Sequence, residues 1–317
     1  MKTVCLLLAG WVAMATPGLS QRVVEVSAAQ DSKGNYIFSC FNHAFCPYVL
    51  RVEFTTLENG SADHVLPFEE EVKPGYTKLF TITADKGKDV QLKYRNSSRK
   101  GCMNPSVKTD FVYLLPIAPG KEAQAFVVGN AGGNVGTGGG KPLSGAGRDS
   151  GYAIRLKMKQ GDTIFAARRG VVTSIDASNT ENDAGATTTD SWNYVEVFQG
   201  DCSFGQYGVF LKNGIFVKPG QTVEAGTPLG LVGGDRYGRG SDARFSVGYF
   251  DGTRTVTIPL IFWTKKNGKG SLKHGGTYIS EYPADIVRQE VKSAAPGKKA
   301  TGSKAAGTGK KKPVKKG

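Results

Sequence analysis

The feature that most restricts the fold of this chain is a short phrase that occurs twice. Residues 159–166 read KQGDTIFA and residues 218–225 read KPGQTVEA, so lysine, glycine, threonine, an aliphatic residue and alanine recur at the same offsets. Each copy predicts a strand, a tight turn and a second strand. A single hairpin cannot bury its own apolar face, but two copies can close on each other around one core. The repeat therefore predicts a compact β domain with approximate internal symmetry.

The segment before the repeat predicts another β domain, over residues 21–128. Short runs of β-branched, aromatic and alternating residues are separated there by turn sequences such as SKGN, ENGS, KPGY and DKGK. The runs are RVVEVSA, NYIFSCF, YVLRVEFTTL, YTKLFTITA, DVQLKYR and FVYLLPIA. This pattern is typical of an antiparallel β-sandwich. The fold class expected for the whole chain is therefore all-β.

Residues 1–20 have the pattern of a secretory signal peptide. Lys2 precedes an apolar run over residues 4–15, and small residues follow up to Ser20. This run is too short to span a bilayer, and no later segment is long enough either. We therefore expect cleavage near Ser20 and a secreted or periplasmic protein.

Cleavage would remove Cys5 with the signal peptide, and export would place the other four cysteines in an oxidising compartment. They are Cys40, Cys46, Cys102 and Cys202. An even number in that setting predicts one or two disulfides, and three pairings stay open. A thiolate metal site is the alternative, but the chain has no CxxC spacing to support it.

Two further segments flank the repeat. Residues 129–151 are glycine-rich, which predicts a linker or a surface loop. A phosphate-binding loop does not fit, because GxxxxGK[ST] is absent and the next segment is strand-like. Residues 284–317 are expected to form a short helix and then a Lys-rich disordered tail, since the tail has little apolar surface to bury.

The formal net charge of +14 is concentrated in this tail, which carries eight lysines and no acidic residue between Lys298 and Lys316. The tail is either a solvated segment or a tether to anionic envelope polymers through salt-sensitive contacts. No aromatic residues alternate with the lysines, so nucleic acid is not favoured as a partner.

The repeat and its surroundings resemble a known family. The stretches YAIRLKMKQGDTIFAARRGVV and FVKPGQTVEAGTPLGLVGGDRYGRGSDARFSV, within residues 152–248, are similar to M23 metallopeptidases of the lysostaphin and LytM type. The resemblance implies a duplicated hybrid motif over residues 152–283 and a role at peptidoglycan. In that family a histidine, an aspartate and the second histidine of a His-x-His sequence hold zinc, and further histidines assist the attacking water.

The residues at these positions depart from the family pattern. The resemblance places Arg155 at the zinc-binding aspartate, Asp242 and Arg244 at the His-x-His sequence, and Val209 at a catalytic histidine. The remaining zinc-binding histidine would fall in the glycine-rich segment, which contains none. Zinc in a hydrolytic site needs about three protein ligands with lone pairs, and a guanidinium has none to give. We therefore expect a catalytically inactive domain with no cofactor.

An inactive domain of this kind predicts binding instead of hydrolysis. Arg155 and Arg244 can each take a carboxylate of a peptide stem, and Tyr207 is expected to lie on the same surface. Asp242 is an alternative partner for either arginine, in which case the pair only neutralises itself. The expected partner is peptidoglycan or a cell-wall hydrolase.

Two other interpretations remain open. An active zinc endopeptidase would have to recruit His43, His64 or His274 together with Asp242, although the two earlier histidines fall in predicted loops. A biotinyl or lipoyl carrier shares the hybrid fold, and LKMK places a lysine between apolar residues. That sequence leads into the Gly161 turn, however, and export disfavours a carrier of metabolic groups.

Overall fold

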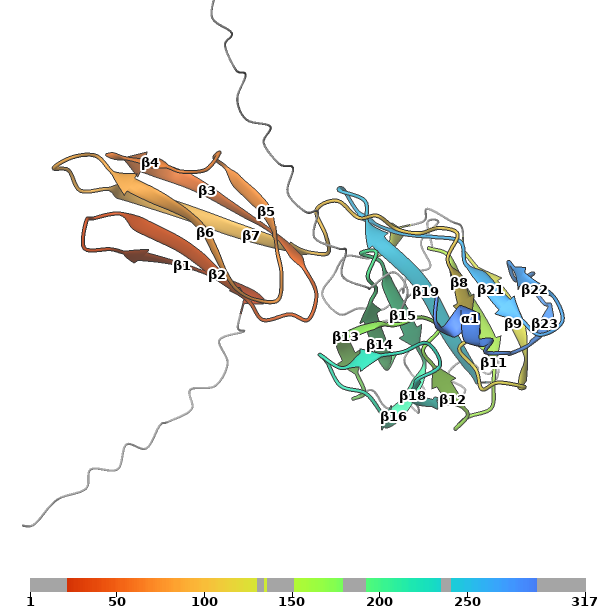
Figure 1. Ribbon diagram of the computed structural model, residues 1–317. Helices are drawn as coiled ribbons and strands as arrows, with labels where there is room; N and C mark the ends of the chain where they lie inside the picture. The colour runs from red at the N-terminus through yellow and green to blue at the C-terminus, as the bar shows by residue number, and fades with distance from the viewer. Residues whose placement is uncertain (1–21, 130–133, 136–150, 179–191, 235–240, 290–317) are drawn as a thin grey trace, which may run out of the picture.

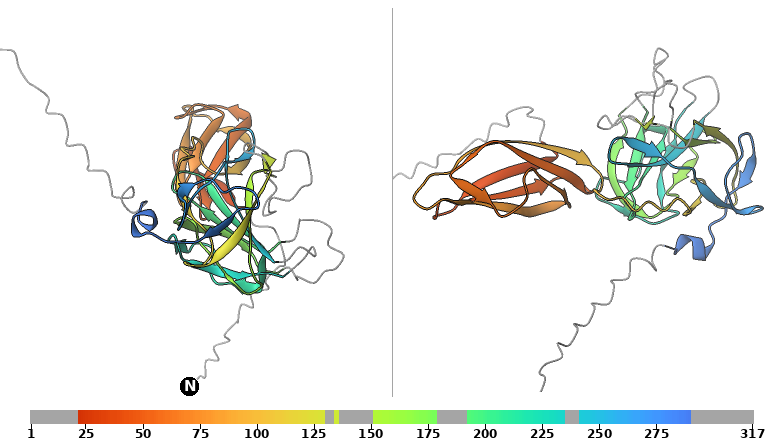
Figure 2. Two further views of the ribbon diagram at one scale, coloured as in Figure 1. Left: turned by 90° about the vertical axis from the view of Figure 1, so that its right-hand side faces the viewer. Right: turned by 90° about the horizontal axis from the view of Figure 1, so that it is seen from above.

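The computed structural model describes residues 22–129, 134–135, 151–178, 192–234 and 241–289. The all-β prediction is confirmed: strands make up two domains that lie end to end, and the described residues contain one short helix, α1 (Ala284–Val287) (Figures 1 and 2). The predicted signal peptide and Lys-rich tail lie outside the described residues, as does most of the glycine-rich segment. No helix in the described ranges is both long and apolar enough to cross a membrane.

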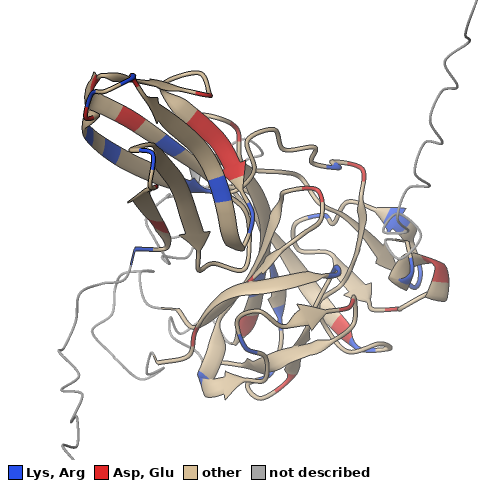
Figure 3. Cartoon of the chain, turned by 60° about the vertical axis from the view of Figure 1, so that its left-hand side comes forward, with Lys and Arg blue, Asp and Glu red and all other residues tan. Residues whose placement is uncertain are grey.

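The N-terminal domain is the predicted antiparallel β-sandwich. One sheet has the order β1 (Val24–Gln30), β2 (Tyr36–Asn42), β6 (Gly75–Ala84) and β4 (Gly60–Ala62). The other has the order β5 (Phe68–Val72), β3 (Tyr48–Glu58) and β7 (Gln91–Lys100). Inward residues of both sheets, among them Phe38, Leu50 and Phe80, form one core. Lysine, arginine and acidic residues are intermixed along the sandwich strands (Figure 3).

The second domain is built on one large sheet. Its strand order is β17 (Thr222–Val223), β13 (Gly170–Asp176), β14 (Tyr194–Phe198), β15 (Phe204–Gly208), β19 (Asp242–Phe250), β11 (Ala153–Lys157), β9 (Glu122–Val128) and β23 (Thr277–Ile279). β20 (Thr255–Thr257) pairs with β19, and β10 (Asn134–Val135) pairs with β20.

Two three-stranded sheets complete the second domain. One has the order β12 (Thr163–Phe165), β18 (Pro228–Val232) and β16 (Phe210–Ile215). The other has the order β22 (Gly268–Gly270), β21 (Ile261–Thr264) and β8 (Val112–Leu114). A single apolar core includes residues of the large sheet and of both small sheets, for example Phe245, Leu229 and Phe262.

The two copies of the repeated phrase form matching turns that bond to each other reciprocally. Gly161 has a φ of 84° and Gly220 a φ of 85°. This left-handed conformation carries no steric penalty for glycine. The Gly161 amide donates to the Val232 carbonyl, which follows the second copy, at 2.9 Å. The Gly220 amide donates to the Val172 carbonyl, which follows the first copy, at 2.8 Å, so the duplication closes one core from two sides.

The sandwich domain ends earlier in the chain than the domain boundary predicted at residue 128. The run FVYLLPIA contains β8, which pairs with β21, and β9 pairs with β11 and β23. Both strands belong to the second domain, and the sandwich ends with β7 at Lys100. The alternating pattern of a strand is the same whichever sheet it joins, so sequence reasoning placed these runs with their neighbours in the chain.

The two domains are fastened together where β7 ends. A disulfide joins Cys102 to Cys202, and Lys100 forms an ion pair with Glu196 on β14. The Arg99 guanidinium lies 4.5 Å from the centre of the Phe250 ring. On another side of the junction, the Phe45 ring packs so closely on Gly220 that a β-carbon there would lie 2.7 Å from it.

The prediction of at least one disulfide is confirmed by Cys102–Cys202, which is consistent with an oxidising compartment. Cys40 and Cys46 are buried free thiols, so a second disulfide is absent from the described residues. Burial raises the pKa of Cys46 to about 12.

Candidate functional site

Three of the predicted site residues, Arg155, Asp242 and Arg244, lie on the face of the large sheet that points away from the core, which we call the outer face. Arg155 on β11 is directly opposite Arg244 on β19, and Arg244 is in turn opposite Gly208 on β15. Phe126 on β9 is opposite Arg155 on its other side. Because directly opposite residues point to the same side of a sheet, the side chains of Phe126, Arg155 and Arg244 form one row across three strands, and the row ends at Gly208 on a fourth.

Arg155 is engaged by Asp242, two residues before Arg244. Its Nε donates to Asp242 Oδ2 at 2.6 Å, and its Nη2 donates to the same oxygen. Both side chains are partly buried, with 23% and 15% of their surface exposed. Of the two partners that the sequence left open for Asp242, the structure has Arg155, and in this pair the two charges neutralise each other.

Arg244 lies against an aromatic ring. Its guanidinium carbon is 4.2 Å from the ring centre of Trp192, which precedes β14. The negative face of an indole ring attracts a cation, and this attraction strengthens where water is excluded. Trp192 is buried and lies close to Gly208, where a β-carbon would be 3.6 Å from its ring. The outer face therefore carries a guanidinium that lies over an indole ring, beside an ion pair.

Val209, at the position that the resemblance assigns to a catalytic histidine, has a structural role. Its φ is 73°, a left-handed conformation that a β-branched residue rarely adopts. Its amide donates to the Asn193 carbonyl at 3.0 Å, and its carbonyl accepts from the Gly233 amide at 2.7 Å. These bonds hold the chain where it passes from β15 to β16. An aliphatic side chain there can neither move a proton nor bind a metal.

Tyr207 does not share the outer face, contrary to the prediction. It is fully buried, its ring packs 4.7 Å from that of Phe245, and its hydroxyl oxygen accepts the Ala167 amide at 2.8 Å. Burial raises its pKa. Tyr207 is adjacent to Gly208 in the strand, so it points into the core while the row points outward. It supports the sheet and does not contact a ligand on the outer face.

The three histidines are dispersed. His43 and His64 both belong to the sandwich domain, where they lie 3.4 Å from Glu25 and 2.9 Å from Glu70 respectively. His274 in the second domain lies 3.1 Å from the Val127 carbonyl, with its ring 5.5 Å from that of Phe126. His274 is thus the histidine nearest the row, beyond Phe126.

The donor set on the outer face does not fit zinc. Two of the positions that the resemblance assigns to metal ligands hold guanidiniums, and the third would fall in the glycine-rich segment, mostly outside the described residues. The nearby carboxylate of Asp242 is already bound to Arg155. Arginine stays protonated and has no lone pair for a metal. Among the described residues, no group of three or more histidine, cysteine, aspartate or glutamate side chains could hold a metal ion.

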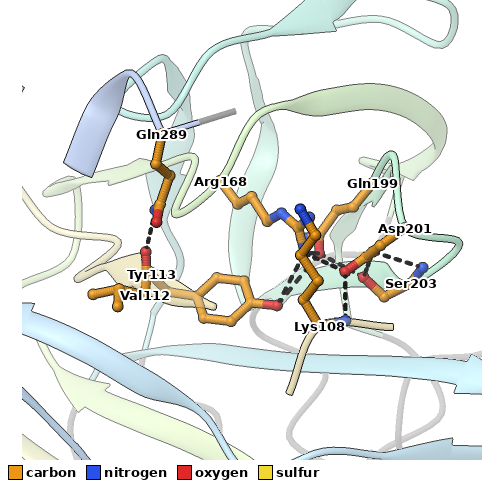
Figure 4. A network of polar contacts seen from close by, with 8 residues as sticks. All are labelled: Lys108, Val112, Tyr113, Arg168, Gln199, Asp201, Ser203 and Gln289. Atoms are coloured by element: carbon orange, nitrogen blue, oxygen red, sulfur yellow. Dashed lines mark hydrogen bonds and ion pairs between the residues drawn. The ribbon is translucent and has the colours of Figure 1, made fainter. Parts of the chain in front are cut away.

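A buried polar network positions the β14–β15 hairpin, which carries part of the outer face (Figure 4). Arg168 is 1% exposed, and its Nη1 donates to Asp201 Oδ2 at 2.8 Å and to Gln199 Oε1 at 3.1 Å. Asp201 also accepts the Lys108 amide at 3.0 Å. The network therefore ties the hairpin to the segment that leaves the sandwich, next to the Cys202 disulfide.

This network sets the ionisation of Asp201. Burial by itself would raise the pKa of this carboxyl, but the Arg168 charge and the hydrogen bonds from Ser203 and the Lys108 amide outweigh it and lower the pKa. Asp201 therefore stays ionised and paired inside the domain. The Arg168 guanidinium carbon also lies 3.9 Å from the ring centre of Phe111, which belongs to the same segment as Lys108.

Sequence reasoning did not identify Trp192, Phe126 or Arg168. A tryptophan just before a predicted strand, in SWNYVEV, was a usable signal for an aromatic at a sheet edge. An arginine inside the apolar run IFAARRGVV indicated a charge that needs a buried partner. Nothing local could have paired Phe126 with Arg155, because that contact depends on β9 joining the second domain.

These observations define the chain as an all-β protein of two disulfide-linked domains, the second built around a duplicated turn. No protein-family model and no curated protein matches it. Among solved structures, it is similar to lysostaphin at 18% identity, covering 40% of this chain and only 46% of that one, with a TM-score of 0.25.

Two other solved structures are similar over more of the chain. A putative M23 peptidase from Pseudomonas aeruginosa is 14% identical, with 66% of this chain and 85% of that one covered and a TM-score of 0.25. Helicobacter pylori Csd3 is 13% identical, with 78% and 77% covered and a TM-score of 0.30. Similarity at these levels carries no conclusion about what this chain does.

Proposed function

We propose that the chain is an exported, catalytically inactive M23/LytM-like protein that acts as a binding or regulatory module at the bacterial cell wall. The observation that carries this proposal is the occupancy of the outer face: Arg155 bound to Asp242, and Arg244 lying on Trp192. The two arginines stand where the resemblance would require zinc ligands. A cation in place of a ligand also repels a metal ion, by about 4 kcal/mol per unit charge at contact distance with an effective dielectric near 20.

In this proposal the two arginines recognise carboxylates of peptidoglycan peptide stems. A guanidinium can take a carboxylate with two parallel hydrogen bonds, a geometry that lysine cannot reproduce. Arg155 is about a quarter exposed and is already bound to Asp242, so in this proposal it shares its charge between Asp242 and the ligand. Trp192 beneath Arg244 fixes the plane of the second guanidinium and favours one orientation of the ligand. Free carboxylates of the stem would therefore bind where the family would present a metal ion to a peptide bond.

Export, the partner and the tail belong to the same proposal. The signal sequence with cleavage near Ser20 would deliver the protein to the periplasm or the exterior, where peptidoglycan or a cell-wall hydrolase is its partner. The Lys-rich tail would add salt-sensitive attraction to anionic envelope polymers. Nucleic acid is not proposed as a partner.

The experiment is calorimetric titration of the mature protein with muropeptides. Wild type is expected to give a binding signal, and Arg244→Lys is expected to weaken it at least tenfold because lysine keeps the charge but loses the planar fork. Arg254→Lys, on an exposed hairpin of the same domain, is the matched control and should bind like wild type. No heat signal from folded wild type, or equal affinity for Arg244→Lys, would refute the carboxylate site. Chelator-sensitive release of fragments would instead favour the active-enzyme alternative.

A further inference from the structure

The sandwich domain carries an exposed apolar patch on the sheet β1-β2-β6-β4, far in sequence from the arginine row. Of the six large apolar residues that are exposed in the described part of the chain, four lie at one end of this domain. They are Val23, Phe41, Phe45 and Tyr76, which are 43%, 45%, 42% and 68% exposed respectively. Exposed apolar side chains are ordinary when they are scattered, but a cluster on one face marks an interaction site.

The centre of the patch is a pair of aromatic rings on adjacent strands. Phe41 on β2 is directly opposite Tyr76 on β6, and both point outward because Cys40 and Asn42, the neighbours of Phe41, are buried. Directly opposite Cβ atoms in a sheet are about 5 Å apart, so the two rings stand next to each other on the same face of the sheet, and we call this pair of rings the platform. The His43 ring lies 4.6 Å from that of Phe41 and extends the platform at its edge.

Polar groups of several kinds surround this platform. Glu25 is directly opposite Phe41 on the side of β1 and lies 3.4 Å from His43. The next outward row holds Ser27 and Ser39, whose hydroxyl oxygens are 2.9 Å apart, and Lys78 opposite Ser39. A carboxylate, hydroxyls and an ammonium therefore border two apolar ring faces. The face offers hydrogen-bond donors and acceptors with little net charge, which does not match a lipid headgroup surface or a nucleic acid.

The size of the patch favours a narrow ligand over a folded partner. If a fully exposed aromatic side chain offers about 200 Å², the exposed fractions of the three aromatic patch residues amount to about 310 Å². A stable protein interface needs about 800 Å² on each partner. A sugar ring has apolar C–H faces and a rim of hydroxyl groups, so it matches both the aromatic rings and their polar border. The weakly positive C–H groups are attracted to the negative face of an aromatic ring.

We propose that this patch binds the glycan strand of a polysaccharide, with Phe41 and Tyr76 stacking on successive sugar rings and Glu25, Ser27, Ser39 and Lys78 bonding to their hydroxyl or amide groups. The choice of peptidoglycan as the polysaccharide rests on the proposed function. Glycan binding by the sandwich and carboxylate binding by the second domain would then hold the two parts of one polymer. The disulfide Cys102–Cys202 keeps these two surfaces on one linked framework.

The experiment titrates the mature chain with a soluble hexasaccharide of N-acetylglucosamine, which carries no peptide. Wild type is expected to bind, Tyr76→Ala and Phe41→Ala to weaken binding at least tenfold each, and Tyr76→Phe to retain it. Val65→Ala is the matched control, since Val65 is 82% exposed on the same domain outside the patch. Melting curves establish that each variant is folded. No binding by wild type, or unchanged binding by the double variant Phe41→Ala/Tyr76→Ala, would overturn the proposal.

Two further measurements separate this proposal from its alternatives. Sedimentation of wild type and the double variant tests for a second copy of the chain on the patch, and a dimer that the double variant loses would overturn glycan binding. Intact sacculi test the proposed function separately. If wild type binds the hexasaccharide but not sacculi or muropeptides, the wall-binding function is refuted and glycan binding by the patch is supported. If the double variant binds sacculi normally and wild type does not bind the hexasaccharide, only glycan binding by the patch is refuted.

Discussion

At the scale of single residues, Arg168 and Asp201 form an ion pair in which both side chains are almost completely buried. Removing one partner of such a pair leaves an uncompensated charge and costs about 3–5 kcal/mol. We expect Asp201→Asn to lower the free energy of unfolding by about that amount in denaturant titrations. Glu224→Gln is the matched control: Glu224 pairs with Arg169 on the surface, and its loss should cost less than about 1 kcal/mol.

The same pair predicts a pH dependence. The pKa of Asp201 is lower in the folded protein than its ordinary value of 3.8, so the unfolded state takes up a proton first as the pH falls. The stabilisation is complete above about pH 4 and is lost as the pH falls through the folded pKa. Wild type should therefore lose stability more steeply than Asp201→Asn below about pH 4. Parallel acid-unfolding curves for the two proteins would contradict this assignment.

The two free cysteines give a test that needs no substitution. Cys46 is buried, and its pKa of about 12 leaves very little thiolate at neutral pH. Cys40 is also buried, and burial raises its pKa as well. Neither should react with a thiol reagent at mildly alkaline pH in the folded protein, and both should react after unfolding in denaturant without reductant. Rapid labelling of the native protein, followed by mass spectrometry, would show that one of these thiols is accessible.

At the scale of elements, the duplicated turns predict a difference between two equivalent glycines. Gly161 and Gly220 share nearly the same positive φ. Alanine in that conformation should cost roughly 1 kcal/mol or somewhat more at either position. A β-carbon at Gly161 would contact nothing within 4 Å, whereas one at Gly220 would meet the Phe45 ring of the sandwich at 2.7 Å. Gly220→Ala should therefore destabilise more than Gly161→Ala in denaturant unfolding.

A double-mutant cycle with Phe45→Ala tests why Gly220→Ala should destabilise the protein more than Gly161→Ala. We call the difference between the two losses of stability the excess. If the excess arises from the contact between the domains, it should disappear in the Phe45→Ala background while the cost of Gly161→Ala stays the same. An excess that persists without the Phe45 ring would mean that Gly220 is constrained from within its own domain.

Much of the element-level structure followed from the sequence, and the failures have identifiable causes. The sandwich strands and the turns of the repeat were predictable because alternation and turn residues are local signals. The repeat does not form two hairpins, however, because β12 pairs with β18 and β17 pairs with β13 instead of with the strands that precede them. The boundary was not, because the run that contains β8 is predicted as a strand, β9 is not predicted as one, and the sheet each joins depends on contacts with β21, β11 and β23. Tyr207, which is expected among the ligand-binding residues, is instead buried in the core, because it is adjacent in β15 to Gly208, the residue opposite Arg244.

The candidate site was predictable only where the family resemblance indicated which distant residues lie close together. It brought Arg155, Asp242 and Arg244 together from residues far apart in the chain, and the structure has them side by side. Trp192 and Phe126 come from segments that the resemblance does not connect to the arginines. Their contacts arise from long-range pairing, which local sequence patterns do not encode.

At the scale of the whole molecule, the disulfide that joins the domains should contribute strongly to stability. Cys102 and Cys202 are 100 residues apart, and closing a long loop removes much of the entropy of the unfolded chain. We expect the double variant Cys102→Ser/Cys202→Ser to be less stable by about 2–5 kcal/mol. Wild type in a reductant should match it, and adding the reductant to the double variant should change nothing. A double variant as stable as oxidised wild type would contradict this role.

Binding of the cell wall by the outer face of the second domain, without a metal and without cleavage, is the part of the proposed function on which the rest depends. Its most direct test is made on one sample: mature protein is incubated with zinc, dialysed, mixed with purified sacculi and sedimented. We expect the protein to sediment with the sacculi, to carry no stoichiometric zinc by elemental analysis and to release no soluble fragments. One zinc per chain together with release of fragments that a chelator abolishes would contradict it.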